Sequence, residues 1–376
     1  MLKNKKTVVV SVTNDLSTDQ RVHKVCLFLC DLGYDVKLVG REQIKSRKIE
    51  NQRYGTKRFK LLFNKGPLFY AEYNVRLFIF LFFKKIDLLV SNDLDTLLSN
   101  YILSRLKPCH LVYDTHEYFT EVPELIHRKK VKYIWEKIEE YIFPKLNTVY
   151  TVSESISELY FEKYKKKINV IRNVAPYWKA TELKTKEELG LPLNKKLIIL
   201  QGAGINVDRG AEEAVQAMRL LENSVLVILG DGDVVPDLKK YVSKNKLESK
   251  VLFFEKCAYN EMMNFTFHAD LGLSLDKPTN INYRYSLPNK IFDYVHAETP
   301  IIATNLIEIA RIINRYQVGV ILEEFTVENL ASTIDALLNN DFKLQEFKKK
   351  CFQAKSFLNW ENEVEVLKNI YKNIEQ

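Results

Sequence analysis

Polar side chains suited to chemistry follow an apolar segment at residues 110–116. Asp114, His116 and Glu117 lie together where this segment ends. A histidine beside carboxylates can contact substrate hydroxyls or transfer a proton, because its charge changes near neutral pH. A histidine hydrogen-bonded within an ordinary turn is the alternative. The sequence therefore predicts a candidate catalytic residue at His116.

A second set of polar residues follows the apolar segment 6–12. Ser17 and Gln20 have the spacing of a capping box, which predicts a helix over about 19–32. Arg21 falls in the first turn of this helix. A helix N-terminus with an arginine suits an anion or an acceptor group. An ordinary cap with a solvated arginine is the alternative.

The second half of the chain carries the glycine-containing segment QGAGINVDRG. Gly202, Gly204 and Arg209 would lie between a strand and a helix. Backbone N–H groups and a guanidinium at a helix start suit a diphosphate. The segment lacks the spacing of a Walker loop or of a dinucleotide fingerprint, and a plain strand–helix turn is the alternative.

The segment SLPNKIFD also combines a helix start with charged residues. Pro288 favours the first position of a helix, which Ser286 precedes. Asn289 and Lys290 then fall in the first turn, beside any bound phosphate. Asp293 lies one turn later, where a carboxylate can bridge two vicinal hydroxyls of a ribose. A surface acid is the alternative for Asp293.

Other polar residues have structural explanations. Asp93 is expected to cap a helix, and His296 and Glu298 to end a helix at the surface. The five cysteines form no CxxC or Cys/His cluster. We therefore expect no metal site and no disulfide framework, which fits a reducing compartment.

The candidate residues share one position, at the end of an apolar segment that a helical pattern follows. Apolar strands alternating with helices indicate parallel sheets covered on both faces. Ligands bind such sheets at the carboxyl ends of the strands. The expected strands are 6–12, 35–40, 87–92, 110–116, 148–153, 168–173, 196–204, 224–232, 250–255, 271–276 and 300–304.

The chain of 376 residues is long enough for two domains. The alternation breaks at 173–181, a proline-containing segment that we interpret as a linker. The fold class expected is therefore α/β, with two doubly wound, Rossmann-like parallel-sheet domains facing a cleft. The expected domains are 1–175 and 182–355.

The basic residues are unevenly distributed. Residues 1–180 carry 32 Lys and Arg against 20 Asp and Glu, whereas the rest carry 24 against 28. This excess favours an anionic partner, such as a membrane surface or a phosphorylated substrate, over nucleic acid, because no nucleic-acid-binding module is recognised. A merely solvated surface is the alternative. The stretch RLFIFLFFKK, residues 76–85, suits either docking at an anionic membrane or a core helix.

No apolar run approaches the length that spans a bilayer, and the N-terminal run is too short for a signal peptide. We therefore expect a cytoplasmic protein, docked peripherally at the inner face of the cell membrane if the basic half binds lipid.

Seven segments, in order over nearly the whole chain, are similar to those of one enzyme family. They are NDLSTDQRVHK, SNDLDTLL, YDTHEYFTEVPEL, TVSESI, VIRNV, QGAGINVDRG and YSLPNKIFDYVHAETPIIAT. Together they resemble glycosyltransferase family 4, the retaining enzymes with the GT-B fold, and within it a bacterial surface-polysaccharide branch.

This resemblance implies roles for the candidate residues. Arg209 and Lys290 would stabilise the leaving diphosphate of a nucleotide-sugar, Asp293 would bind its ribose, and His116 would lie near the transferred sugar. The implied donor-binding residues are Gly202, Gly204, Arg209, Ser286, Asn289, Lys290 and Asp293. The implied acceptor-side residues are Asn14, Arg21 and Glu117.

The resemblance also implies that the last helix, within 357–376, packs back on the first domain. Two positions depart from the family pattern. Tyr285 stands where the first of two glutamates is usual, and Ala203 stands where an arginine usually follows the glycine of the diphosphate loop.

The function expected is metal-independent transfer of a sugar, with retention, from a nucleotide diphosphate-sugar to a lipid-linked or glycan acceptor. A UDP-sugar is the first expectation for the donor and a GDP-sugar the second, with no other cofactor. A non-catalytic sugar-nucleotide or membrane-binding module and a nucleotide-sugar epimerase on the same fold are the alternatives.

Overall fold

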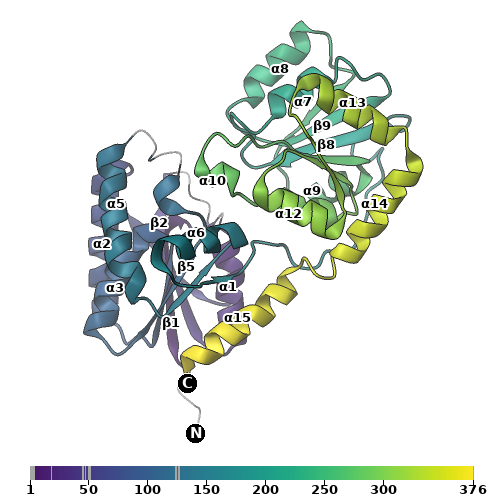
Figure 1. The fold of residues 1–376 in the computed structure, drawn as a ribbon. Coiled ribbons are helices and arrows are strands. Elements are labelled where there is room, and N and C mark those ends of the chain that lie inside the picture. Colours follow the sequence, from purple (N-terminus) through teal and green to yellow (C-terminus); the bar gives the residue numbers. More distant parts are fainter. Residues whose placement is uncertain are drawn as a thin grey trace. The chain divides into compact units, whose positions relative to one another are not determined.

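The computed structural model describes residues 5–17, 19–44, 46, 48–49, 52–122, 125 and 128–375. The chain divides into two compact units (Figure 1). Unit 1 comprises Met1–Arg172 and Val364–Gln376, and unit 2 comprises Asn173–Glu363. Each unit is built around a parallel sheet of its own.

Unit 1 contains, in its described residues, a seven-stranded parallel sheet of order β3-β2-β1-β4-β5-β6-β7. Its inner strands are rich in Val and Leu and are buried, as strands covered on both faces must be. The strands are β1 (Thr7–Asp15), β2 (Asp35–Glu42), β3 (Gly55–Lys60), β4 (Leu88–Asn92), β5 (His110–Thr115), β6 (Thr148–Thr151) and β7 (Asn169–Val170).

Helices cover both faces of this sheet. In Figure 1, α2, α3 and α5 lie on one side and α1 on the other. The helices of unit 1 are α1 (Gln20–Asp31), α2 (Gly66–Phe82), α3 (Leu94–Leu106), α5 (Lys129–Ile142) and α6 (Glu154–Tyr164), with short 3₁₀ turns at Phe119–Glu121 and Phe143–Lys145. Neither β3 nor the full length of α2 was predicted from the sequence.

Unit 2 contains a six-stranded parallel sheet of order β10-β9-β8-β11-β12-β13. Its strands are β8 (Lys196–Gly202), β9 (Ser224–Gly230), β10 (Val251–Phe254), β11 (Leu271–Ser274), β12 (Ile301–Ala303) and β13 (Gly319–Ile321). Its helices are α7 (Ala211–Ala217), α8 (Val235–Lys244), α9 (Tyr259–His268), α10 (Ile281–Arg284), α11 (Asn289–His296), α12 (Ile307–Tyr316), α13 (Val327–Leu338) and α14 (Asp341–Ala354).

Helix α15 (Trp360–Glu375) carries the chain from unit 2 back to unit 1. Its Tyr371 is buried in unit 1, where the ring packs edge-on against Phe28 of α1 with centroids 5.5 Å apart. The Tyr371 hydroxyl also lies 3.4 Å from that of Tyr150 on β6. These aromatic contacts complete the core of unit 1.

The strand order reverses once in each sheet, between β1 and β4 in unit 1 and between β8 and β11 in unit 2. At such a switch point the following helices leave on opposite faces, so the loops at the carboxyl ends separate and leave room for a ligand. The doubly wound α/β fold class is confirmed. The two switch points are the places to look for sites.

Candidate active-site residues in the two units

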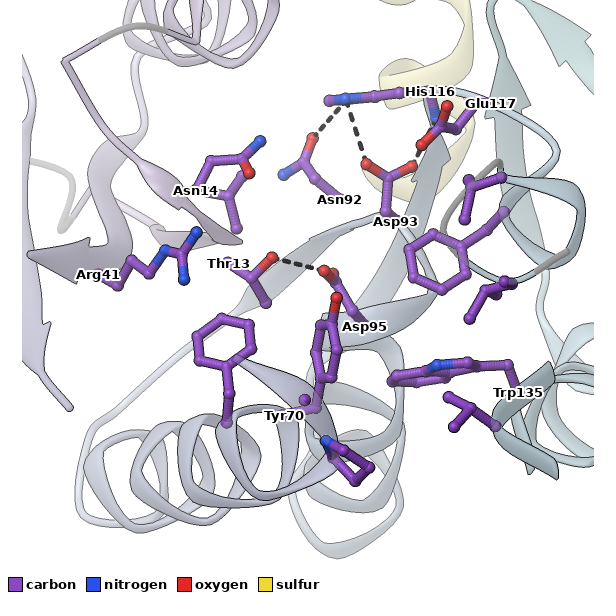
Figure 2. A pocket seen from close by; sticks show the side chains of 18 of the residues that line it. Thr13, Asn14, Arg41, Tyr70, Asn92, Asp93, Asp95, His116, Glu117 and Trp135 are labelled. Carbon is purple, nitrogen blue, oxygen red and sulfur yellow. Dashed lines mark hydrogen bonds and ion pairs between the residues drawn. The ribbon is translucent and has the colours of Figure 1, made fainter. Parts of the chain in front are cut away.

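Unit 1 has a pocket of about 300 Å³ at its switch point (Figure 2). One wall of this pocket is polar and includes Thr13 of β1, Asn92 at the end of β4 and Asp95 in the first turn of α3. An aromatic wall faces it, where the Trp135 ring lies 5.2 Å from Tyr70 and 5.3 Å from Phe119, centroid to centroid. A polar wall opposite aromatic rings suits a sugar, which has hydroxyls at its edge and apolar C–H groups on its face.

His116 lies on the polar wall, directly after β5. Its Nε2 is 3.2 Å from Oδ1 of Asn92 and 3.3 Å from Oδ2 of Asp114, and its Nδ1 is 3.4 Å from Oδ2 of Asp93. Burial alone would lower the pKa of His116, but the carboxylates of Asp93 and Asp114 outweigh it and raise this pKa to about 9. His116 is therefore a cation at neutral pH.

Asp93 does not cap a helix, so the capping prediction is wrong. It occupies the N-cap position of α3, yet no cap hydrogen bond forms. Its Oδ1 instead accepts the backbone N–H of His116 at 2.8 Å. Its backbone has φ 57° and ψ 169°, a conformation that costs a non-glycine residue about 1–3 kcal/mol. The strained turn therefore directs the carboxylate toward His116.

Asp95 lines the same pocket from the first turn of α3. Its Oδ2 accepts the Thr13 hydroxyl at 2.5 Å, a contact drawn in Figure 2. Burial and the nearby charge of Asp93 raise the pKa of Asp95 to about 8. At neutral pH this carboxyl is mostly protonated, so it can donate a hydrogen bond through its O–H as well as accept one.

Arg21 lies away from the pocket surface, in an internal ion pair. Its Nε and Nη2 donate to the two carboxylate oxygens of Asp114 at 3.1 and 2.7 Å, and its Nη1 donates to the Ile171 carbonyl at 2.8 Å. Only 3% of Arg21 is exposed, and Asp114 is fully buried. The expectation of an open anion or acceptor contact at Arg21 is wrong, because a partner 93 residues later takes up the guanidinium.

The start of α1 also differs from the sequence prediction. Asp19 is the N-cap residue, and its side chain accepts the Val22 N–H at 3.1 Å. Ser17 instead bonds to the carboxylate of Asp15, so the predicted capping box of Ser17 and Gln20 is wrong.

Asn14 and Glu117 both line the pocket of unit 1. Asn14 follows Thr13 near the end of β1, and its amide lies 3.3 Å from the Asp19 carboxylate. Glu117 follows His116 and is exposed. The structure thus places two of the three expected acceptor-side residues at one pocket with His116, and leaves Arg21 beneath it.

In unit 2 a buried carboxylate joins two of the expected phosphate-binding residues. Asp276, fully buried just beyond β11, has one oxygen 2.5 Å from Nη1 of Arg209 and the other 3.6 Å from Nζ of Lys290. Burial would raise the pKa of Asp276, but Lys290 and Arg209 outweigh it and hold the pKa below its ordinary value. Two cations against one carboxylate leave an excess positive charge at this switch point.

Local structure fixes the Arg209 side chain. The following residue, Gly210, has φ 73°, and a Cβ there would meet Leu275 at 2.3 Å, so only glycine allows this close approach. The guanidinium also lies 4.3 Å from the ring centroid of Tyr283. Tyr283 belongs to the short helix α10, which Asn280 caps by accepting the Tyr283 N–H. Helix α10 was not predicted from the sequence.

Three other residues expected to bind the donor, Gly202, Ser286 and Asn289, lie near Arg209 or Lys290 in the sequence. A Cβ at Gly202 would meet only the Gly204 nitrogen, at 3.9 Å, so that side of the loop after β8 is open. The Ser286 hydroxyl donates to the Tyr283 carbonyl at 2.9 Å. Asn289 is exposed in the first turn of α11, which begins one residue later than predicted because Pro288 is its N-cap.

Asp293 on α11 is buried within a hydrogen-bonded network. Its carboxylate accepts the Tyr259 hydroxyl at 3.1 Å and the Gln201 amide at 3.4 Å. Thr266 donates to the Gln201 oxygen at 2.6 Å, which fixes the amide. The carboxylate is therefore already held by protein groups, and a ribose would have to share these contacts.

His296 at the end of α11 is fully buried, so its expected surface position is wrong. Its Nε2 lies 2.6 Å from the Leu358 carbonyl, and its Nδ1 lies 3.3 Å from the Trp178 nitrogen. These contacts tie the linker and the segment before α15 to α11.

Several residues that the structure brings into these sites were not predicted from the sequence. Asp276 ends an expected strand, and this position alone could have indicated it. Asp95 stands two residues after Asp93, but its raised pKa comes from burial and from the charge of Asp93, which only the folded structure brings together. Gln201 lies within the glycine-containing segment, whereas no signal in the sequence indicated Tyr259.

No group of three or more His, Cys, Asp and Glu side chains among the described residues is arranged to hold a metal ion. The same part of the chain contains no helix long and apolar enough to cross a bilayer.

Two protein-family models match the chain, one in each half. Residues 19–175 match Glycosyltransferase Family 4, and residues 182–354 match Glycosyl transferases group 1. The matches follow the order of the two units. A search of the curated proteins found no match.

Solved structures share the fold at low sequence identity. A glycosyltransferase from Rickettsia africae ESF-5 is 17% identical with a TM-score of 0.78, over 99% of both chains. Sucrose-phosphate synthase from Thermosynechococcus elongatus is 15% identical with a TM-score of 0.81, over 99% of both chains. HepE of Anabaena, solved with UDP-glucose, is 14% identical with a TM-score of 0.75, over 98% of this chain and 99% of that one. The chain is a glycosyltransferase of the GT-B fold, in which a Glycosyltransferase Family 4 domain precedes a Glycosyl transferases group 1 domain.

Proposed function

We propose that this glycosyltransferase moves a sugar from a UDP-sugar to a glycan or lipid-linked acceptor in bacterial surface-polysaccharide synthesis. The configuration at the anomeric carbon is retained. The observation that carries the donor assignment is the excess positive charge of Arg209 and Lys290 around Asp276. A diphosphate supplies the negative charge that this arrangement lacks. The retaining outcome and the pathway rest on the family resemblance of the sequence segments.

Electrostatic stabilisation of the leaving group is the proposed source of catalysis. The bond between the anomeric carbon and the diphosphate oxygen breaks, and its electron pair leaves with the diphosphate. Arg209 and Lys290 stabilise that charge. The acceptor hydroxyl oxygen bonds to the anomeric carbon on the face that the diphosphate leaves, and its proton passes to the departing phosphate oxygen.

His116 acts as a hydrogen-bonding cation in this proposal. With a pKa of about 9 it is protonated at neutral pH and cannot serve as a general base there. Both ring nitrogens of the protonated form already face Asn92, Asp93 and Asp114, so a hydroxyl oxygen of the transferred sugar would share these contacts. Asp93 and Asp114 keep it charged.

The pocket of unit 1 is the proposed acceptor site. Asn14, Glu117 and Asp95 offer hydrogen-bonding groups on its polar wall, and Trp135 offers an apolar face for a sugar ring. UDP is the preferred nucleotide because HepE, which shares the fold, was solved with UDP-glucose. GDP is the second choice.

A metal-free thermal-shift panel of UDP, GDP, ADP, CDP and their sugars tests the donor assignment. A ligand that binds only the folded site stabilises it by about 2.7 kcal/mol at a hundred times its Kd. We expect UDP and one UDP-sugar to raise the melting temperature, and Arg209→Ala to reduce the shift strongly. No shift with any nucleotide would overturn the proposal.

A further inference from the structure

Helix α2 of unit 1 exposes large apolar side chains where a helix of a globular domain usually carries charge. Leu68, Val75 and Ile79 are more than half exposed, Phe82 is 43% exposed and the following Phe83 is 81% exposed. We call these five residues the α2 face. Their spacing of 7, 4 and 3 residues along α2 places Leu68, Val75, Ile79 and Phe82 in one stripe.

The opposite side of the same helix is buried in the core of unit 1. Tyr73, Leu77 and Leu81 are fully buried there. A helix that is apolar all round is normally covered on every side. The α2 face therefore needs a second covering that unit 1 itself does not supply.

Basic side chains border this apolar stripe. Lys65 precedes α2 and Lys85 follows it, and both are exposed. The Lys84 ammonium lies 4.8 Å from the Phe80 ring, and that of Lys107, which follows α3, lies 5.5 Å from the Phe82 ring. Lysines around exposed aromatic and aliphatic groups match the headgroup layer of an anionic bilayer.

The acidic residues near the stripe do not offset this charge. Glu72 pairs with Arg76 at 2.7 Å and accepts the backbone N–H groups of Leu62 and Phe63. Asp87 accepts the Thr7 N–H within the sheet. A second copy of the chain is a poor covering, because a two-fold contact would bring these lysines against one another.

The N-terminal turns of α2 also form part of the pocket in unit 1. Phe69 and Tyr70 line that pocket, whereas the adjacent Leu68 belongs to the α2 face. Val131 and Trp135 on α5 line it as well, and α5 exposes Tyr133 and Ile134 beside them. A surface that covers the α2 face would therefore lie next to the mouth of the pocket.

We propose that the α2 face inserts into an anionic lipid bilayer and that the acceptor is lipid-linked, taken by the pocket directly from that bilayer. The acceptor part of this inference rests on the proposed function, which assigns the pocket to the acceptor. The membrane part stands on the α2 face and its lysines alone.

Flotation with phosphatidylglycerol vesicles tests the membrane part. The wild-type chain should float with these vesicles and not with phosphatidylcholine vesicles. The double variant Val75→Asp, Ile79→Asp should bind at least about tenfold more weakly, since two apolar groups are lost from the bilayer. The matched control Leu220→Asp, Phe342→Asp changes two exposed apolar residues of unit 2 and should float like the wild type.

Two results would overturn the membrane part. One is a wild-type chain that does not float, and the other is a Val75→Asp, Ile79→Asp variant that floats as well as the wild type. A dimer that this variant dissociates, without vesicle binding by the wild type, would assign the α2 face to a second copy instead. The thermal shift with UDP should be equal in all three proteins, which shows that each is folded.

The acceptor part is tested with vesicles made from a total bacterial lipid extract and the labelled UDP-sugar that gives the thermal shift. Label that partitions into organic solvent, at a rate lowered by Val75→Asp, Ile79→Asp, supports a lipid-linked acceptor. Label that enters only water-soluble products would overturn it. If no UDP-sugar binds, the proposed function fails while the flotation result still decides the membrane part.

Discussion

The two switch points use opposite arrangements of charge. In unit 1, carboxylates surround cations: Asp93 and Asp114 hold His116, and Asp114 also holds Arg21. In unit 2, cations surround a carboxylate, because Asp276 is shared by Arg209 and Lys290. The same topology therefore yields one cluster in which two carboxylates hold two cations and one in which two cations share a single carboxylate.

This difference suggests that the two units bind different substrates. A spare cation attracts an anionic group such as a diphosphate, so unit 2 suits the donor. A neutralised cation surrounded by hydrogen-bonding groups suits hydroxyls, so unit 1 suits a sugar. The predictions below test this contrast, from the largest expected effect to the smallest.

Asp114→Asn should have the largest effect, on the stability of unit 1. It leaves the Arg21 guanidinium buried without its ion-pair partner, which costs about 3–5 kcal/mol. Asp276→Asn should cost less, about 1–3 kcal/mol, because Arg209 and Lys290 are 27% and 13% exposed and can reach water. Urea unfolding measures both.

Single tryptophans can report on each unit in that experiment. Trp135 is the reporter for unit 1 once Trp178 and Trp360 are replaced by Phe, and Trp178 is the reporter for unit 2 once the other two are replaced. Equal losses of stability in the two variants would contradict the contrast.

Lys290→Ala should weaken UDP binding by roughly tenfold to a hundredfold, the value of one charge-assisted hydrogen bond to a phosphate. Isothermal titration calorimetry without metal measures the affinity. Arg284→Ala is the control, since Arg284 is exposed and has its guanidinium near Tyr285 rather than at Asp276. A similar loss in both variants would assign the effect to general charge.

Asp95 should make unit 1 less stable as pH rises. Between its ordinary pKa of 3.8 and about 8, the folded state holds a proton on Asp95 that the unfolded state releases. Stability therefore falls with rising pH in that window. Asp95→Asn removes this dependence of the free energy of unfolding on pH. The difference in stability between variant and wild type should therefore shift in favour of the variant as the pH rises from about 4 to about 8. A difference that does not vary with pH would count against the raised pKa.

His116 should titrate near pH 9 in an NMR titration of the histidine rings, because Asp93 and Asp114 stabilise its charged form against the effect of burial. Asp93→Asn should lower this pKa toward 6.5 by about one unit. His23 in the same unit is an internal control, since burial lowers its pKa and no change is expected there. A His116 that titrates below 7 would remove the contrast between the two sites.

The sheets could be predicted from the sequence because their strands are continuous apolar runs between helical patterns. The segment 87–92 becomes β4 and 110–116 becomes β5, with differences of one residue at the ends. Strand β3, with the sequence GTKRFK, was missed because an edge strand that is mostly exposed lacks an apolar run.

The location of the site residues could be predicted from the sequence, but the residues that they contact could not. His116 was identified because it follows a strand, whereas the role of Arg21 was wrong because its partner Asp114 is distant in sequence. Likewise Asp276 can form ion pairs with both Arg209 and Lys290 only because the fold brings these two residues to it. The exposed stripe of α2 is also a property of the tertiary structure, since its sequence is apolar on all sides.

The measurement that tests the central claim most directly is a comparison of UDP and UMP binding by the wild type and by Arg209→Ala. If Arg209 binds the diphosphate, the wild type should bind UDP roughly tenfold to a hundredfold more tightly than UMP. The variant should lose most of that preference while its UMP affinity changes little. A preference that survives in Arg209→Ala would contradict the account.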